Sequence, residues 1–251
     1  MARAAVPGGL SARRAWRAAV LVDRRTETPS ACTLVLEVEA WGGHLAGQHV
    51  DVRLTAEDGY QAARSYSLAG PAEGGRIEIT VQRIAGGEVS PFLVDELAVG
   101  DRVEVRGPLG GWFVWRPTDR APVLLVAGGS GVVPLMAMIR ARAGVSRAPF
   151  RLVHSVRTPD DRIYAAELRR RAAEDGGLDV SYVYTREAPD VSPRPPGRIR
   201  ADDLAAHGWP PDFEPTCYVC GPTPLVEAVA GLLVSAGHEP GRIRTERFGG
   251  A

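Results

Sequence analysis

The sequence predicts two domains of different class, an antiparallel β-barrel or sandwich followed by an α/β domain with a parallel sheet. Up to about residue 116, apolar and polar residues alternate in short runs between Gly, Pro, Asp and Glu clusters, which is typical of antiparallel strands. After residue 122, continuously apolar runs alternate with helical segments, which indicates a parallel sheet covered on both faces. We therefore place the domains at residues 14–117 and 118–251, after a tail at 1–13.

The alternation of period two defines the strands of the first domain. Strands are predicted at residues 18–22, 33–39, 49–54, 76–81 and 102–106, and a further strand closes at 64–67. One helix interrupts them over residues 90–97, because Ser90 and Pro91 suit an N-cap and a first-turn proline.

The second domain begins with the buried strand 123–127 and then alternates helices with strands. Further strands are predicted at residues 151–156, 178–184, 216–220 and 242–248. Helices are predicted at 135–142, 164–174 and 224–236, with a short one near Asp202 after a Pro-rich loop at 192–197.

Composition excludes several functional classes. The 251 residues have a formal net charge of zero, so no overall field favours nucleic acid or an anionic membrane. All 30 basic residues are arginine, which excludes lysine Schiff-base chemistry and a Walker-type phosphate loop. The apolar runs are too short to span a bilayer. We expect a cytoplasmic protein whose first thirteen residues form a disordered tail.

Three cysteines, Cys32, Cys217 and Cys220, are too few for a disulfide framework. Cys217 and Cys220 have the spacing of a redox couple or a zinc half-site. No second Cys/His pair stands at ligand spacing, so we expect no metal. A redox couple remains an open alternative.

The most informative motif is Arg64-Ser65-Tyr66-Ser67, at the end of one predicted strand. An arginine can hold a phosphate, an aromatic ring can stack on a flat ring, and a hydroxyl can hydrogen-bond its edge. Arg64 and Tyr66 share a face because side chains alternate in a strand. Gly86-Gly87-Glu88-Val89-Ser90 then leads into a helix, where a pyrophosphate can sit. The first motif would also suit an ordinary surface strand.

A second glycine turn, Gly128-Gly129-Ser130-Gly131, lies between an apolar strand and a helix. Its backbone N–H groups and the helix N-terminus can bind an anion, although many such turns bind nothing. Cys220-Gly221-Pro222 ends the fourth parallel strand, where ligands of such sheets bind. Cys220 would also suit a small buried position. Two phosphate sites and a stacking platform indicate two dinucleotides face to face, the arrangement of hydride transfer.

Taken together, the motifs resemble the ferredoxin–NADP reductase superfamily of flavin-dependent, nicotinamide-using reductases, over residues 15–250. Six signatures occur in the order of that superfamily: Gly47-Gln48-His49, Arg64-x-Tyr66-Ser67, Gly87-x-x-Ser90, Gly107-Pro108-Leu109-Gly110, the Gly128 turn through Pro134, and Cys220-Gly221-Pro222. The resemblance implies a six-stranded antiparallel flavin-binding barrel at 14–117, a parallel-sheet nicotinamide-binding domain at 118–251, and FAD with NADP or NAD as cofactors.

The resemblance also implies roles for individual residues. Tyr66 would stack on the isoalloxazine, Ser67 would hydrogen-bond near its N5, and Cys220 would lie near the hydride-donating carbon. Ser67 and Cys220 are thus expected to be catalytic. The cofactor-binding residues are expected to be Arg64, Ser65, Tyr66, Ser67, Gly87, Val89, Ser90, Gly128, Gly129, Ser130, Gly131, Pro134, Arg157, Thr185, Arg186, Cys220, Gly221 and Pro222.

The implied function is an FAD-dependent oxidoreductase that takes hydride from NAD(P)H and passes electrons to an acceptor. Many relatives carry a fused Cys-rich [2Fe–2S] domain, whereas this sequence has no cysteine run. We therefore expect the acceptor to be a separate ferredoxin or oxygenase component. Two alternatives stay open: a reductase that releases reduced flavin, and a non-catalytic flavin-binding regulatory subunit. The intact Tyr66, Ser67 and Cys220 favour turnover.

Coenzyme choice leans towards NADPH. The third parallel strand ends at Thr185 and Arg186, and a hydroxyl followed by an arginine resembles the 2′-phosphate site of the superfamily. Arg157 and Arg198 are possible second donors. Nearby acidic residues, Glu187 among them, keep NADH open.

Overall fold

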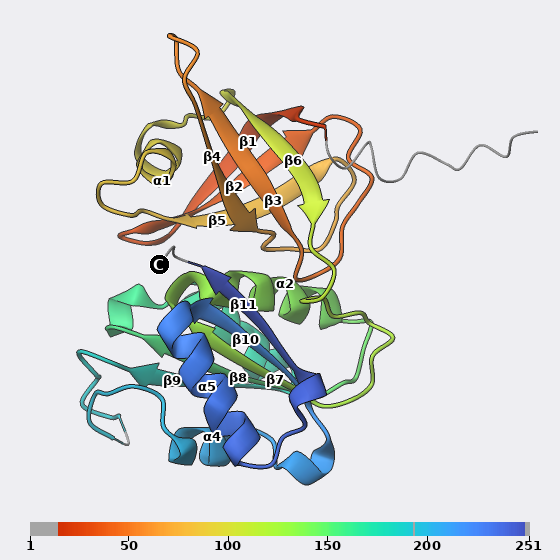
Figure 1. The fold of residues 1–251 in the computed structure, drawn as a ribbon, viewed down its shortest axis with the longest axis vertical. Helices are drawn as coiled ribbons and strands as arrows, with labels where there is room; N and C mark the ends of the chain where they lie inside the picture. The colour runs from red at the N-terminus through yellow and green to blue at the C-terminus, as the bar shows by residue number, and fades with distance from the viewer. Residues whose placement is uncertain (1–14, 193, 249–251) are drawn as a thin grey trace, which may run out of the picture.

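The computed structural model describes residues 15–192 and 194–248 and shows the two predicted classes of sheet, one above the other (Figure 1). The predicted tail, 1–13, lies outside the described residues. The first sheet is antiparallel and consists of β1 (Arg17–Thr28), β2 (Ala31–Val38), β3 (His49–Thr55), β4 (Gln61–Ser67), β5 (Arg76–Gln82) and β6 (Arg102–Leu109). The predicted six-stranded barrel is confirmed.

The strand order, β4-β3-β6-β1-β2-β5, makes β4 and β5 the two edges of the first sheet. Just beyond β4, Leu68 forms a bridge with Ile79 of β5 and brings these edges together. Alternate residues of the strands fill the barrel core, for example Leu21, Leu34 and Val52, none of which is exposed. The strand that ends in the tetrapeptide 64–67 is therefore an edge strand, accessible to a ligand.

The helix of the barrel begins one residue earlier than predicted. α1 (Val89–Pro91) has Glu88 at its N-cap and continues as a π-helical turn, Phe92–Glu96. Ser90 thus lies within the helix, and its N-cap assignment was wrong. Arg24 of β1 donates to the carbonyls of Leu97 and Val94 at 2.8 and 2.5 Å, which satisfies the end of this helix.

The second sheet is parallel, with β7 (Val123–Gly128) in its centre. Its order is β11-β10-β7-β8-β9, with β8 (Phe150–Val156), β9 (Leu178–Tyr184), β10 (Thr216–Pro222) and β11 (Ile243–Phe248). α2 (Val132–Arg142) and α3 (Ala165–Glu174) pack on the face towards the barrel, and α4 (Ala201–His207) and α5 (Thr223–Ser235) on the other (Figure 1). α2 begins three residues before the prediction, immediately after a 3₁₀ turn over Gly129–Gly131.

Buried polar groups join the two sheets. The hydroxyl of Tyr164, before α3, hydrogen-bonds that of Thr80 on β5, which in turn bonds that of Thr33 on β2 at 2.7 Å. Arg140 of α2 forms ion pairs with Glu78 of the barrel at 2.8 Å and with Glu167 of α3 at 2.6 Å. These contacts fix the orientation of the parallel sheet relative to the barrel.

We predict that Arg140→Ala destabilises the protein far more than the loss of a surface charge. The Arg140 side chain is 11% exposed, and its removal takes one of two arginine partners from each of two half-buried carboxylates, since Glu78 keeps Arg25 and Glu167 keeps Arg171. The free energy of unfolding should fall by about 2 kcal/mol, measured by urea denaturation. Arg170→Ala is the control, since its pair with Glu174 is exposed and should contribute little. Equal losses in both variants would contradict this account of the interface.

Candidate active site

The two domains meet where the end of β4 faces the carboxyl ends of β10 and β11 (Figure 1). Ser67, the last residue of β4, donates from Oγ to Oε1 of Glu246 at 3.2 Å. The parallel register pairs Glu246 on β11 with Cys220 on β10. Side chains from two domains therefore converge at one point, and two of them, Ser67 and Cys220, are the predicted catalytic residues.

Glu246 is the residue that sequence reasoning missed. Burial raises the pKa of this carboxyl to about 7, although the hydrogen bond from Ser67 opposes the rise. Near neutral pH, Glu246 is thus divided between its protonated and ionised forms and can give or take a proton. The sequence does show an acidic residue near the end of the last predicted strand, which could have marked Glu246 as a candidate. The sequence does not show, however, that this strand pairs Glu246 with Cys220.

Cys220 is a neutral thiol in this site. Its side chain is fully buried, and burial, followed by the charge of Glu246, raises its pKa well above the usual value. It is therefore no nucleophile at neutral pH, and with no exposed surface it contacts core groups in this structure, so a ligand would reach it only after a neighbouring side chain moves.

Cys217 lies on the opposite face of β10, in the core towards α5, and contacts His238 at 3.9 Å. Cys220 belongs to the core on the α2 side. Because the two thiols are separated by the sheet, the redox couple considered above is excluded.

The turn between β7 and α2 packs backbone against backbone on the end of β10. Gly129 has φ +53°, a conformation that favours glycine. A Cβ on Gly131 would lie 2.1 Å from the carbonyl oxygen of Cys220, so only glycine fits there. No side chain caps the start of α2, and Pro134 is buried in its first turn. The predicted anion-binding turn is thus brought directly beside Cys220, with Gly128 at the end of β7 and Gly221 and Pro222 at the end of β10.

Tyr66 and Arg64 share one face of β4, as predicted, opposite Val50 and Val52 in the register. Burial raises the pKa of Tyr66 to about 12, so its ring is neutral. The Arg64 side chain is 57% exposed and lies 3.5 Å from Glu88, an ion pair that the sequence did not reveal. Ser65 points to the other side and donates to Asp51 at 2.6 Å, so its hydroxyl is not brought to this face.

The segment from Gly87 to Ser90 leads from the turn after β5 into the first residues of the barrel helix. The Ser90 hydroxyl accepts a hydrogen bond from the backbone N–H of Ile84 at 3.1 Å. Val89 is buried in the barrel core. The Gly87 N–H donates to the carbonyl of Ile84 at 3.0 Å, and the Ser90 oxygen already has one partner, so the N–H groups that stay available to a ligand are those in the first turn of the helix, which begins at Val89.

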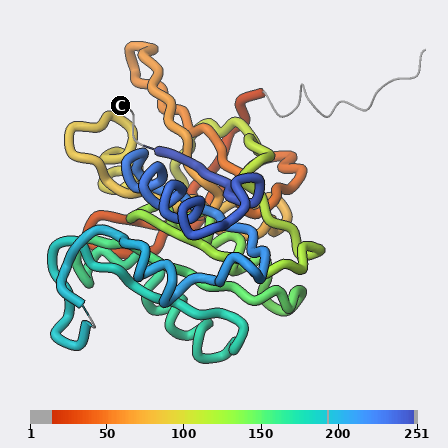
Figure 2. Tube along the Cα trace, turned by 60° about the horizontal axis from the view of Figure 1, so that its bottom comes forward, coloured from red at the N-terminus to blue at the C-terminus, as the bar shows by residue number. Residues whose placement is uncertain are grey.

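The predicted coenzyme residues follow β8 and β9, at the edge of the parallel sheet. The Thr185 hydroxyl donates to the carbonyl of Val156 at 3.2 Å, and the Arg186 N–H donates to the carbonyl of Arg157 at 3.0 Å. These two bonds, one from a side chain and one from the backbone, hold the two strand ends together. Both arginine side chains are exposed, and the following loop extends from the edge of the molecule (Figures 1 and 2).

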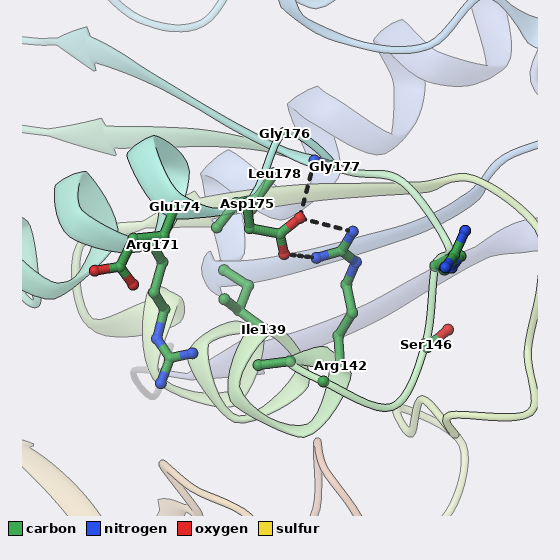
Figure 3. Close-up of a pocket in the computed structure, with 12 residues that line it drawn as sticks. Ile139, Arg142, Ser146, Arg171, Glu174, Asp175, Gly176, Gly177 and Leu178 are labelled. Atoms are coloured by element: carbon green, nitrogen blue, oxygen red, sulfur yellow. Dashed lines mark hydrogen bonds and ion pairs between the residues drawn. The ribbon is translucent and has the colours of Figure 1, made fainter.

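A hollow of about 550 Å³ lies at the amino-terminal edge of the parallel sheet, opposite the carboxyl ends of the strands, between the end of α2 and the start of β9 (Figure 3). Arg142, which lines it, is paired with Asp175 and donates to the carbonyl of Ala148 at 2.5 Å. The guanidinium thus secures the loops at this edge. The hollow does not contain any of the predicted site residues.

No cluster of three or more metal-ligating side chains occurs among residues 15–192 and 194–248. Within the same described ranges, none of the helices is long and apolar enough to cross a membrane.

Comparison with known proteins identifies the family. Residues 19–114 match the oxidoreductase FAD-binding domain, and residues 125–231 match the oxidoreductase NAD-binding domain. The chain belongs to the ferredoxin–NADP reductase-like superfamily, as its motifs indicated. Its first domain binds FAD and its second binds a nicotinamide coenzyme.

Several relatives are reductase components of oxygenase systems. The chain is 32% identical over 206 residues to the ferredoxin–NAD(P)(+) reductase component of the naphthalene 1,2-dioxygenase/salicylate 5-hydroxylase systems of Ralstonia sp., covering 80% of this chain and 60% of that protein. It is 34% identical over 213 residues to the glycine betaine monooxygenase reductase subunit of Pseudomonas aeruginosa, covering 81% and 56%. The chain thus spans less than two thirds of these relatives.

A similar solved structure is the flavohem-like FAD/NAD-binding domain of nitric oxide dioxygenase from Vibrio cholerae. The TM-score is 0.83 at 26% identity, covering 93% of this chain and 99% of that one. The match confirms the arrangement of barrel and parallel sheet.

We predict that Glu246 gives the rate of FAD reduction by NAD(P)H a pH dependence with an apparent pKa near 7. In Glu246→Gln, which cannot ionise, the profile should become flat from about pH 6 to 8. Stopped-flow absorbance of the flavin measures the rate. Glu174→Gln, an exposed change on α3, should retain the wild-type profile. An unchanged inflection in Glu246→Gln would assign the titration to another group.

Proposed function

We propose that this protein is an FAD-dependent oxidoreductase that takes hydride from NAD(P)H and passes electrons to a separate acceptor, such as a ferredoxin or an oxygenase component. The observation that carries the proposal is the convergence of Ser67, Glu246 and Cys220 where an FAD-binding domain meets an NAD-binding domain. When bound, the flavin supplies the step from two-electron to one-electron chemistry. The protein supplies binding, orientation and a titrating carboxyl.

The barrel offers the groups that a flavin requires. The ring of Tyr66 would stack on the isoalloxazine, and Ser67, at the end of the same strand, would hydrogen-bond its edge. Arg64 would hold a flavin phosphate by exchanging its contact with Glu88 at 3.5 Å for the stronger pair with phosphate. The N–H groups of Val89 and Ser90, in the first turn of the barrel helix, would complete this phosphate site.

The parallel sheet offers the groups that the coenzyme requires. The uncapped start of α2, with Gly128, Gly129, Ser130 and Gly131 before it, would bind the pyrophosphate through backbone N–H groups. Cys220, Gly221 and Pro222 would form the wall beside the nicotinamide. Because Cys220 is neutral and buried, this wall excludes water without adding charge.

The relatives and the cysteine content both favour an electron acceptor that is a separate protein. The two relatives described above are the reductase parts of a dioxygenase and a monooxygenase system. These 251 residues contain three cysteines, all buried and free, whereas an iron–sulfur cluster takes four ligands. The one-electron acceptor therefore lies outside this stretch of chain. The cytoplasmic location expected from the sequence stays a prediction.

The proposal is tested by cofactor content and anaerobic reduction. The purified or reconstituted protein should release FAD on heating, identified by chromatography, and its yellow colour should bleach on addition of NAD(P)H. The reduced protein should then pass electrons faster to a ferredoxin than to free flavin. Bleaching followed by release of reduced flavin would identify a flavin reductase instead. Bound FAD that neither coenzyme reduces would identify a regulatory subunit, and recovery of FMN alone would refute the FAD assignment.

For the coenzyme we propose NADPH, because Arg157 and Arg186 are exposed together where β8 and β9 end. We predict that Arg186→Ala lowers kcat/KM for NADPH about tenfold or more, through loss of a charge-assisted contact with the 2′-phosphate, and leaves NADH unaffected. Arg147→Ala, in the hollow at the opposite edge, is the control. A wild-type preference for NADH above tenfold would overturn the assignment.

A further inference from the structure

His154 is a fully buried histidine on β8, below the glycine turn that precedes α2. Its side chain is 0% exposed, and Nε2 lies 3.0 Å from the carbonyl oxygen of Gly129. The other ring nitrogen, Nδ1, has no hydrogen-bond partner within the described part of the chain. Burying a polar atom without a hydrogen-bond partner costs free energy. An apolar aromatic residue at this position would avoid that cost, so the histidine needs a functional or structural explanation.

The ionisation state of His154 defines the direction of this bond. Burial lowers its pKa to about 4, so the imidazole is neutral at pH 7 and carries one N–H. A carbonyl oxygen only accepts hydrogen bonds, so Nε2 must carry the proton and donate it to Gly129. Nδ1 is then left as the unpartnered acceptor.

The ring is held in place by its neighbours on β9. The ring centroid of Tyr182 lies 5.7 Å from that of His154, and the Arg162 guanidinium lies over the Tyr182 ring, 5.5 Å from its centroid. The imidazole is thus confined between the turn and an aromatic wall, which keeps Nε2 directed at Gly129.

The bond fixes the orientation of one peptide group in the turn. The carbonyl oxygen of Gly129 also accepts a hydrogen bond from the N–H of Val132 at the start of α2. Since a trans peptide is planar, its C=O and N–H point in opposite directions. Holding the Gly129 carbonyl towards His154 therefore directs the N–H of Ser130 away from the sheet interior, towards the open carboxyl edge. Gly129, at φ +53°, has no Cβ and can adopt other conformations at little cost, so the bond from His154 adds a restraint from outside the turn to the local one from Val132.

We infer that His154 is a positioning residue for coenzyme binding, which donates to the Gly129 carbonyl so that the N–H of Ser130 faces the coenzyme pyrophosphate. The inference rests on the proposed function, which places the pyrophosphate at this turn. His154 touches neither cofactor; it acts through the backbone of the turn.

The test compares His154→Phe, which keeps an aromatic ring but removes the donor, with His154→Gln, which keeps an N–H at similar reach. In His154→Phe, KM for NAD(P)H should rise about five- to tenfold, the effect of one lost hydrogen bond. Because FAD lies in the other domain, FAD content and kcat at saturating coenzyme should stay within about twofold. His154→Gln should recover most of the wild-type KM.

A purely structural role is separated by a control and by direct binding. His238→Phe replaces the other buried histidine, which contacts Cys217 far from the turn; it should leave KM unchanged even where it lowers Tm. The affinity for ADP-ribose, a diphosphate without nicotinamide, is measured by calorimetry on the FAD-loaded protein and requires no turnover. It should fall five- to tenfold in His154→Phe and recover in His154→Gln.

The outcomes distinguish the two claims. Unchanged ADP-ribose affinity in His154→Phe, or equal losses in the Phe and Gln variants, overturns the inference about His154. If the wild-type protein binds ADP-ribose but its flavin is reduced by neither coenzyme, the proposed function is wrong. The calorimetric comparison of the His154 variants then still decides the inference about His154.

Discussion

The structure depends on the fixed contact between α2, α3 and the barrel strand β5. Each half of the active site belongs to a different domain, so Ser67 reaches Glu246 only while the two sheets keep one orientation. The Tyr164–Thr80–Thr33 hydroxyl chain and the ion pairs of Arg140 supply that orientation from buried groups. Buried hydrogen bonds are directional and costly to leave unmade. They therefore define the angle between the two sheets more sharply than apolar packing alone. The same helix, α2, carries the glycine turn at its start, so the interface also places the turn that is proposed to bind the coenzyme pyrophosphate.

Burial has opposite consequences for the two ionisable groups beside Ser67. It keeps Cys220 protonated throughout the neutral range, whereas it brings Glu246 to the middle of that range. The carboxyl also links the site to stability. Its pKa is about 7 in the folded protein against 4.5 for the free group, so the folded state binds more protons between these values. Stability contributed by this group is complete below about pH 4.5 and is lost as the pH rises through 7. The site thus holds a carboxyl where ionisation is unfavourable, which is typical of functional positions.

Much of the fold was predictable because periodicity reports on burial. The change from alternating to continuous apolar runs gave both sheet classes, and strand alternation placed Arg64 and Tyr66 on one face. The same parity rule separates Cys217 from Cys220, three residues apart on one strand, and could have excluded a redox couple from the sequence alone. Glu246 and Glu88 were missed because their partners lie 179 and 24 positions away, at Ser67 and Arg64. Such pairings follow from register and helix placement, which local patterns do not encode. Ser90 was misplaced for a related reason: its hydroxyl is used by Ile84 inside the helix and not at its cap.

Arginine is the only basic residue type in the chain besides histidine, so its abundance alone says nothing about phosphate sites. Structure separates the arginines by what they already bind. Arg24, Arg140 and Arg142 donate to backbone carbonyls or buried carboxylates and hold loops and domains together. Arg64 contacts Glu88 at 3.5 Å and donates to the carbonyl of the neighbouring Ala63 at 2.8 Å, and a phosphate can displace the first of these contacts. Arg157 and Arg186 extend into solvent at the edge where the coenzyme is expected. An arginine whose donors are already used in a buried network would lose those bonds by turning to a ligand. Recognition of phosphate is therefore left to exposed or weakly paired arginines, and among these Arg64, Arg157 and Arg186 lie beside the two proposed dinucleotide sites.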